Sequence, residues 1–217
     1  MPISLSDGNA KLSKPNGGLY KILGFGIPAD HSMTLNGVQF NTCPGAKACR
    51  GVCYAKQGRY IMPNVVAAKA GNLQASLAPS FVDDMVAAIM RRRSFNTIRI
   101  HDAGDFYSQE YYNAWCRIAA RLPDHTFYAY TKSLHLDLWT GKPANLRIVQ
   151  SLGGKWDSRV DLSRPHARIF SSDEARIAAG YVDGNVNDLP AIDGIVNIGL
   201  VFHGTRKLTL AQIEYFS

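Results

Sequence analysis

An alternation of strand-like and helix-like segments in the second half of the chain constrains the fold most. Strands are expected where β-branched and aromatic residues cluster, at 97–101, 126–130, 146–150, 167–170 and 194–202. Helices are expected among them at 108–121, near 133–139, at 172–179 and from Thr209 onward. Strands that alternate with helices in this way pair in parallel through right-handed crossovers. The sequence therefore predicts an α/β fold built on a parallel β/α array.

Two architectures satisfy this alternation: a doubly wound sheet, or a sheet curled into a partial or small (β/α) barrel. We favour the curled sheet. Residues 1–217 are expected to form a single domain, in which turn formers make 1–35 an irregular N-terminal extension or edge hairpin. The β/α core would occupy 36–217, starting with a strand at 37–41, and two consecutive helices are expected between 63 and 93, the second beginning near Ser80.

Composition and charge restrict the cellular location and the partners that the protein can be expected to have. No apolar run reaches the roughly 18 residues that a membrane span requires, and the polar N-terminus lacks the apolar stretch of a signal peptide. We therefore expect a cytoplasmic protein without a membrane partner. The formal net charge of +7 favours contact with anionic molecules, and nucleic acid is one candidate partner.

The stretch "FNTCPGAKACRGVCYAKQGRY" holds Cys43, Cys49 and Cys53, three of the four cysteines of the chain. Clustered thiols in a reducing compartment indicate metal binding or catalysis sooner than disulfides. Structural zinc sites take four ligands, whereas a 4Fe-4S cluster held by three local cysteines can take its last ligand from elsewhere or from a small molecule. We favour the cluster, keep zinc as the second interpretation, and keep structural or disulfide-forming cysteines as the third.

The fourth ligand is open at the level of sequence. Cys116 lies in an amphipathic helical pattern, where a lone cysteine more often behaves as a small buried hydrophobic residue. The candidates for the fourth ligand are Cys116, His101, His203, Asp102 and an exogenous molecule. Lys56 and Arg59, beside the cysteines, would offset the negative charge of a thiolate-bound cluster, or they are exposed residues of a polar turn.

Polar residues follow several of the expected strands, and in both architectures the carboxyl ends of the strands form the working surface. Asp105 would bind an ammonium or hydroxyl group, or would cap the following helix. Lys132 would neutralise a phosphate or a carboxylate, or it is a solvated loop lysine. His101 would carry a proton or bind a metal, whereas His203 is better explained as a satisfied histidine at a domain edge.

The chain resembles the bacteriophage and plasmid family named after gene product 88. The resemblance covers most of the chain, from the cysteine stretch through "IRIHDAGDFYSQEYYNAW" and "FYAYTKS" to "AGYVDGNVNDLPAIDGIVNIGLVFHGTRKLT". A phage-encoded protein of this kind would work in the host cytoplasm.

More distantly, three clustered cysteines that lead into a parallel β/α array are similar to the radical S-adenosylmethionine (SAM) enzymes. That resemblance implies a 4Fe-4S cluster on Cys43, Cys49 and Cys53, with SAM on the open iron. It also implies that Tyr54 lies near the adenine and that Gly104 and Asp105 lie near the methionine amino group. The spacing differs, because five and then three residues separate these cysteines, whereas those enzymes have three and then two.

Three functions follow from these interpretations. The first is a compact radical-SAM-like enzyme, whose catalytic residues and substrate the sequence does not identify. The second is a redox, sensing or nucleic-acid-binding module that keeps the cluster without catalysis. The third is a zinc protein. Basic residues that would contact nucleic acid occur at Arg91, Arg92, Arg93, Lys142 and 206–208.

Overall fold

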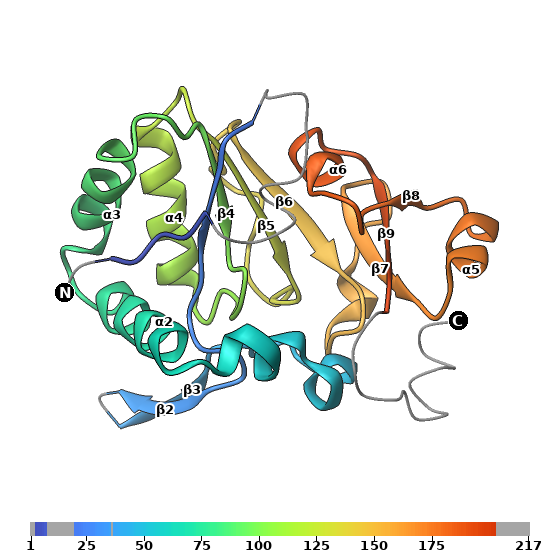
Figure 1. Cartoon of the computed structure of the whole chain (residues 1–217), viewed down its shortest axis with the longest axis horizontal. Helices are drawn as coiled ribbons and strands as arrows, with labels where there is room; N and C mark the ends of the chain where they lie inside the picture. Colours follow the sequence, from blue (N-terminus) through green and yellow to red (C-terminus); the bar gives the residue numbers. More distant parts are fainter. Residues whose placement is uncertain (1–2, 8–19, 36, 203–217) are drawn as a thin grey trace.

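The computed structural model describes residues 3–7, 20–35 and 37–202, and its centre is a seven-stranded parallel sheet curled into a half-barrel (Figure 1). The strand order is β1-β4-β5-β6-β7-β9-β8. The strands are β1 (Ile22–Phe25), β4 (Thr97–Ile100), β5 (Thr126–Thr131), β6 (Leu146–Ser151), β7 (His166–Phe170), β8 (Val182–Asp183) and β9 (Asn197–Val201). The predicted α/β class and the preferred curled sheet are confirmed.

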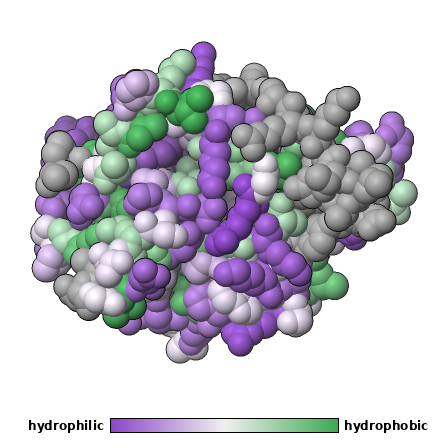
Figure 2. All heavy atoms as spheres, turned by 90° about the horizontal axis from the view of Figure 1, so that it is seen from below, coloured by the Kyte–Doolittle hydropathy of each residue, from purple (hydrophilic) through white to green (hydrophobic). Residues whose placement is uncertain are grey.

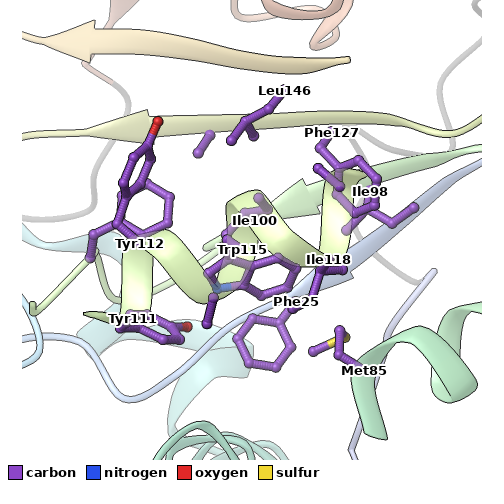
Figure 3. Packing of buried hydrophobic residues seen from close by; sticks show 14 of the residues in the cluster. Phe25, Met85, Ile98, Ile100, Tyr111, Tyr112, Trp115, Ile118, Phe127 and Leu146 are labelled. Carbon is purple, nitrogen blue, oxygen red and sulfur yellow. The ribbon is translucent and has the colours of Figure 1, made fainter. Parts of the chain in front are cut away.

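Three helices cover one face of the sheet, namely α2 (Pro63–Ser76), α3 (Phe81–Met90) and α4 (Gln109–Arg121). Alternate strand residues such as Ile98, Ile100 and Phe127 point toward these helices and are fully buried. Trp115 of α4 packs edge-on against Phe25, with 5.1 Å between ring centroids (Figure 3). This aromatic core joins the helices to β1, β4 and β5.

The other face of the sheet carries the alternate residues, among them Ile22, Tyr128 and Val149. The short helix α6 (Leu189–Ile192) packs on this concave face, where Ala191 and Ile192 are buried. A further short helix, α5 (Asp173–Ala178), connects β7 to β8. No helix in the described part of the chain is long and apolar enough to cross a membrane.

Several expected elements differ from the structure. Residues 22–25 form the buried parallel strand β1 instead of part of an extension, because their side chains complete the core. The expected strand at 37–41 exists as β3 (Val38–Asn41), but it pairs antiparallel with β2 (Ser32–Leu35) outside the main sheet. The expected helix near 133–139 is wrong, because this segment is a loop in which Asp137 accepts hydrogen bonds from the amides of Trp139 and Thr140.

Two short elements, β8 and α6, carry no sequence pattern strong enough to predict them, since each has four residues or fewer. The two helices between 63 and 93 are confirmed, and α3 begins after Ser80 as expected. The helix expected from Thr209 lies outside the described residues.

Helix α4 has an N-cap that gives a small, testable contribution to stability. The Ser108 hydroxyl accepts a hydrogen bond from the Tyr111 amide at 3.2 Å. Ser108→Ala should lower the free energy of unfolding by about 1 kcal/mol in urea titrations. Ser80→Ala is the matched control, because the Ser80 hydroxyl donates to Asp84 and makes no capping bond. Equal losses in the two variants would contradict the assignment of the cap.

Candidate functional site

The cysteine loop, residues 42–61, lies across the carboxyl ends of the central strands, at the lower side of Figure 1. Backbone hydrogen bonds attach it there. The Asp105 amide donates to the Thr42 carbonyl at 2.8 Å, and the Lys155 amide donates to the Gly45 carbonyl at 2.9 Å. The loop is therefore tied both to the segment after β4 and to the segment after β6. Seen from below, this side of the molecule is mostly hydrophilic (Figure 2).

Gly45 permits the closest approach between the loop and the sheet. A β-carbon at this position would lie 2.1 Å from the carbonyl oxygen of Lys132, which follows β5. Only glycine leaves room for that contact. The cysteine loop and the carboxyl end of β5 are therefore in direct van der Waals contact.

The three thiols of the loop lie close enough for their charges to act on one another. Burial, together with the nearby charges of Asp105, Cys53 and Cys49, raises the pKa of Cys43 to about 12. Burial likewise raises the pKa of Cys53, and the charge of Cys49 adds to this. The Cys43 sulfur accepts a hydrogen bond from the Asp30 amide at 3.2 Å. All three cysteines are reduced and partly buried.

Three thiols are ligands of the kind that an iron-sulfur cluster or zinc takes, but their side chains do not surround a common metal position in this structure. Among the described residues, no three His, Cys, Asp or Glu side chains are placed to hold a metal ion together. The loop itself offers only sulfur, since no acidic residue occurs between Asp30 and Asp83. The same stretch contains five lysines and arginines. The ligand set Cys43, Cys49 and Cys53 stays a prediction.

The charge of Lys132 interacts with those of Cys49 and Cys43. Its ammonium group donates to the Ser151 hydroxyl at 2.7 Å, to the Ser151 carbonyl at 3.3 Å and to the Leu152 carbonyl. Burial lowers the pKa of Lys132, while the charges of Cys49 and Asp105 act in the opposite direction. Lys132 thus lies at the carboxyl ends of the strands, where the sequence placed it, and its ammonium group is hydrogen-bonded to residues at the end of β6.

Asp105 is buried and fully engaged by its own chain. One carboxylate oxygen accepts from the Thr131 hydroxyl at 2.6 Å and from the Phe106 amide at 2.8 Å, and the other accepts from the Lys132 amide at 2.9 Å. Burial raises the pKa of Asp105, and these hydrogen bonds partly offset the rise. The carboxylate therefore joins the segment after β4 to the end of β5.

Gly104, the other half of the predicted SAM-contacting pair, has a structural reason to be glycine. Its φ of +84° lies in the left-handed region, and a β-carbon would meet the Ile27 side chain at 2.2 Å. Both facts follow from how the segment after β4 passes over the segment after β1.

Asp102 is the centre of a polar cluster that sequence reasoning found only in part. Its carboxylate forms an ion pair with Lys69 of α2 at 2.6 Å, and its carbonyl accepts from the Tyr54 hydroxyl at 2.6 Å. The Tyr60 hydroxyl lies 3.4 Å from the same carbonyl, and the Lys69 ammonium lies 5.1 Å from the Tyr60 ring centroid. Gly26 makes room, since a β-carbon there would lie 1.8 Å from the Asp102 carboxylate. The lone lysine inside an apolar helical pattern was the available signal for Lys69.

His101 lies in the aromatic core. Its Nε2 is 2.9 Å from the Tyr111 hydroxyl, and its ring centroid is 4.7 Å from that of Phe106. Burial, together with the charge of Lys69, lowers the pKa of His101 to about 3. The backbone at His101 is left-handed, with a φ of 64°. The imidazole is therefore neutral at physiological pH and packs as a core residue.

The remaining candidates for the fourth ligand also have defined positions. Cys116 packs on α4 against the same core, as the sequence favoured, and burial raises its pKa. The groups whose charges act on it are Lys142 and Arg117, and neither belongs to the cysteine loop. His203 lies outside the described residues.

The basic residues beside the cysteines are arranged around Asp30. Its carboxylate accepts from Lys56 at 2.8 Å and lies 3.2 Å from Arg50. Burial alone would raise the pKa of Asp30, but Lys56, Arg50 and Asn41 together outweigh it and hold the pKa below its usual value. Arg59 is exposed and forms no ion pair with the described residues.

The other predicted basic residues lie at the opposite edge of the sheet. Arg91, Arg92 and Arg93 follow α3 and precede β4, so they lie at the amino ends of the strands. Lys142 precedes β6 and donates to the carbonyls of Pro143 and Leu146. Residues 206–208 are outside the described part of the chain.

Comparison with known proteins assigns the chain to a phage protein family. The model of the family described as gene product 88 matches residues 3–207. The chain is 32% identical to the gene 88 protein of Mycobacterium phage L5 over 113 residues, which is 47% of each protein. It is 29% identical to the gene 88 protein of Mycobacterium phage D29 over 149 residues, 58% of this chain and 62% of that protein.

The chain thus spans less than two thirds of the length of these curated relatives. No solved structure matches it. Because the family model covers nearly the whole sequence, this chain belongs to the gene product 88 family.

Proposed function

We propose that this protein binds a 4Fe-4S cluster through Cys43, Cys49 and Cys53. The observation that carries the proposal is that one short loop, tied by backbone hydrogen bonds to the carboxyl ends of a parallel half-barrel, contains all three thiols. Thiolate is the usual ligand of iron-sulfur clusters. The buried ammonium of Lys132 supplies positive charge where thiolates would otherwise be costly to bury.

A three-thiol site favours the cluster over structural zinc. The two carboxylates whose charges act on these cysteines, Asp30 and Asp105, are already bound by lysine, arginine or backbone donors. A closed tetrahedral zinc site would need a fourth protein ligand in addition to the three thiols of the loop. A cluster can instead leave one iron open to a small molecule.

The finer proposal is that SAM occupies this open position and that the protein is a compact radical-SAM-like enzyme. When bound, such a cluster supplies single electrons, and in radical SAM enzymes these cleave SAM reductively. The chain's own part is to hold the loop rigidly against the sheet through Gly45 and Tyr54 and to provide positive charge through Lys132. The alternative is a module that keeps the cluster for redox sensing or nucleic-acid contact in the host cytoplasm.

Anaerobic purification tests the cluster. The wild type should show the broad brown absorbance of a 4Fe-4S protein, with iron and sulfide close to four per chain after reconstitution. Cys43→Ser, Cys49→Ser and Cys53→Ser should each lose this absorbance. Cys116→Ser is the matched control and should keep it, because Cys116 packs on α4. Circular dichroism shows whether each variant is folded.

Two results would count against the cluster: stoichiometric zinc without iron after anaerobic reconstitution, or equal absorbance in all four serine variants. Adding SAM to the reduced protein then tests the finer proposal. A change in the electron paramagnetic resonance spectrum supports the enzyme, whereas an unchanged spectrum of an intact cluster supports the sensing module.

A further inference from the structure

The concave face of the half-barrel carries a buried polar cluster that the cysteine site does not use. Arg99 of β4 and Tyr128 of β5 are neighbours in register, and Asp188, directly before α6, reaches both. The Asp188 carboxylate lies 2.7 Å from the Arg99 guanidinium and accepts from the Tyr128 hydroxyl at 2.8 Å. The guanidinium also lies 5.9 Å from the ring centroid of Tyr130. Arg99 is 9% exposed and Asp188 is 1% exposed.

Three polar atoms of this cluster have no partner among the described residues. They are Nε of Arg99, Oδ1 of Asp188 and the hydroxyl of Tyr130, and all three are buried. The two carboxylate oxygens of Asp188 differ: Oδ2 accepts two hydrogen bonds, and Oδ1 accepts none from the described residues. Buried polar groups in native proteins are almost always hydrogen-bonded, and leaving one unpaired is costly. A donor, an acceptor and a hydroxyl that are unpaired in one place indicate a ligand.

The cluster lies next to the cysteine loop, and Tyr54 is the residue between them. The Tyr54 side chain is 52% exposed, but its hydroxyl end is buried against the Asp102 carbonyl at the end of β4. Burial raises the pKa of Tyr54, and the charges of Arg99, Cys53 and Asp188 also act on its hydroxyl. Tyr54 is therefore close to both the cysteine loop, to which it belongs, and the polar cluster on the concave face.

The unpaired atoms define the chemistry of the ligand. Arg99 and Asp188 neutralise each other, so an uncharged ligand suits the site better than an ion. The free Nε–H of Arg99 calls for an acceptor, and the free Oδ1 of Asp188 calls for a donor. An N–H beside a carbonyl on one planar edge offers both groups.

We propose that this concave-face cluster binds an uncharged heterocycle with an N–H next to a carbonyl, the edge that uracil, thymine and guanine share. The inference concerns binding alone and stands whether or not the cysteines hold a cluster.

Ligand-detected NMR with nucleosides tests the proposal on the purified full chain. The probes are uridine and inosine, and their controls are 3-methyluridine and 1-methylinosine, in which a methyl group replaces the N–H. At least one probe should bind, and its methylated counterpart should bind at least about tenfold more weakly, since a hydrogen bond to a charged group is lost. A short oligouridylate, compared with uridine, shows whether a free nucleoside or a base within nucleic acid is preferred. Binding of neither probe, or equal binding of the methylated forms, would overturn the proposal.

Two tyrosine variants locate the site. Tyr130→Phe removes a hydroxyl that has no partner, so the variant should keep or increase its thermal stability while losing affinity for the probe about tenfold. Tyr128→Phe removes a hydroxyl that Asp188 already binds, so its melting temperature should fall. A Tyr130→Phe variant that is destabilised and binds the probe with unchanged affinity would assign the hydroxyl to the fold and remove it from the site.

Discussion

Asp105→Ala is expected to lower the free energy of unfolding by about 3–5 kcal/mol, because three donors lose their common acceptor in a buried position. The donors are the Thr131 hydroxyl and the amides of Phe106 and Lys132. Urea denaturation at neutral pH measures the loss. Hydrogen exchange should also quicken at the Asp105 amide, which binds the Thr42 carbonyl and thereby holds the start of the cysteine loop.

Asp105→Asn refines this experiment. The asparagine retains one oxygen as an acceptor, but its amide group would direct a donor at the Lys132 amide or at the Thr131 and Phe106 donors. We expect a loss of stability smaller than that of the alanine variant. Asp124→Ala is the control, since Asp124 is an exposed turn residue, and it should change stability by less than about 0.5 kcal/mol. If both Asp105 variants are as stable as the wild type, the hydrogen bonds of this carboxylate do not stabilise the fold, and the prediction is wrong.

His101 is expected to make the protein lose stability in acid, starting below about pH 6.5, before ordinary carboxylates begin to titrate. Its pKa in the folded protein is about 3, whereas a histidine in an unfolded chain has a pKa of about 6.5. Between these values the unfolded chain binds more protons, so stability is present above pH 6.5 and is lost as the pH falls toward 3. Lowering the pH from 6 to 4 should cost about 2.5 kcal/mol through this residue alone.

His101→Asn separates this contribution from those of other groups. Asparagine tolerates the left-handed backbone of this position better than most residues and does not titrate. The variant is expected to be less stable at pH 7, because the contact with Tyr111 changes, but its stability should fall less steeply between pH 6 and 4. Urea titrations at several pH values give both slopes. Parallel slopes in the two proteins would show that His101 titrates normally and is not held neutral by the core.

The local pattern of residues sufficed for much of the fold. The strands β4, β5, β6, β7 and β9 and the helices α2, α3 and α4 lie where apolar periodicity and helix-start residues placed them. Parallel pairing followed from the alternation itself. The polar residues after β4 and β5 were also expected at one edge of the sheet, and Asp105 and Lys132 do meet there.

The local sequence pattern did not predict which strands pair with one another. Residues 38–41 read as a strand, but whether that strand joins the sheet or a separate hairpin depends on which other strand it meets, and here it meets β2. The apolar run at 22–25 gave no sign that it would close the sheet beside β4. The segment 133–139 buries Leu134 and Leu138 as a loop, because tertiary contacts override its helical spacing.

The sequence by itself determined the kinds of element, their order, and the presence of three thiols in one loop without carboxylates. Only the tertiary structure decided what those residues touch. Arg99 and Asp188 are 89 positions apart, and Lys69 and Asp102 are 33 apart, so no local pattern links them. Secondary structure depends on backbone preferences within a few residues, whereas a buried charge is stable only beside the partner that the packed sheet brings to it.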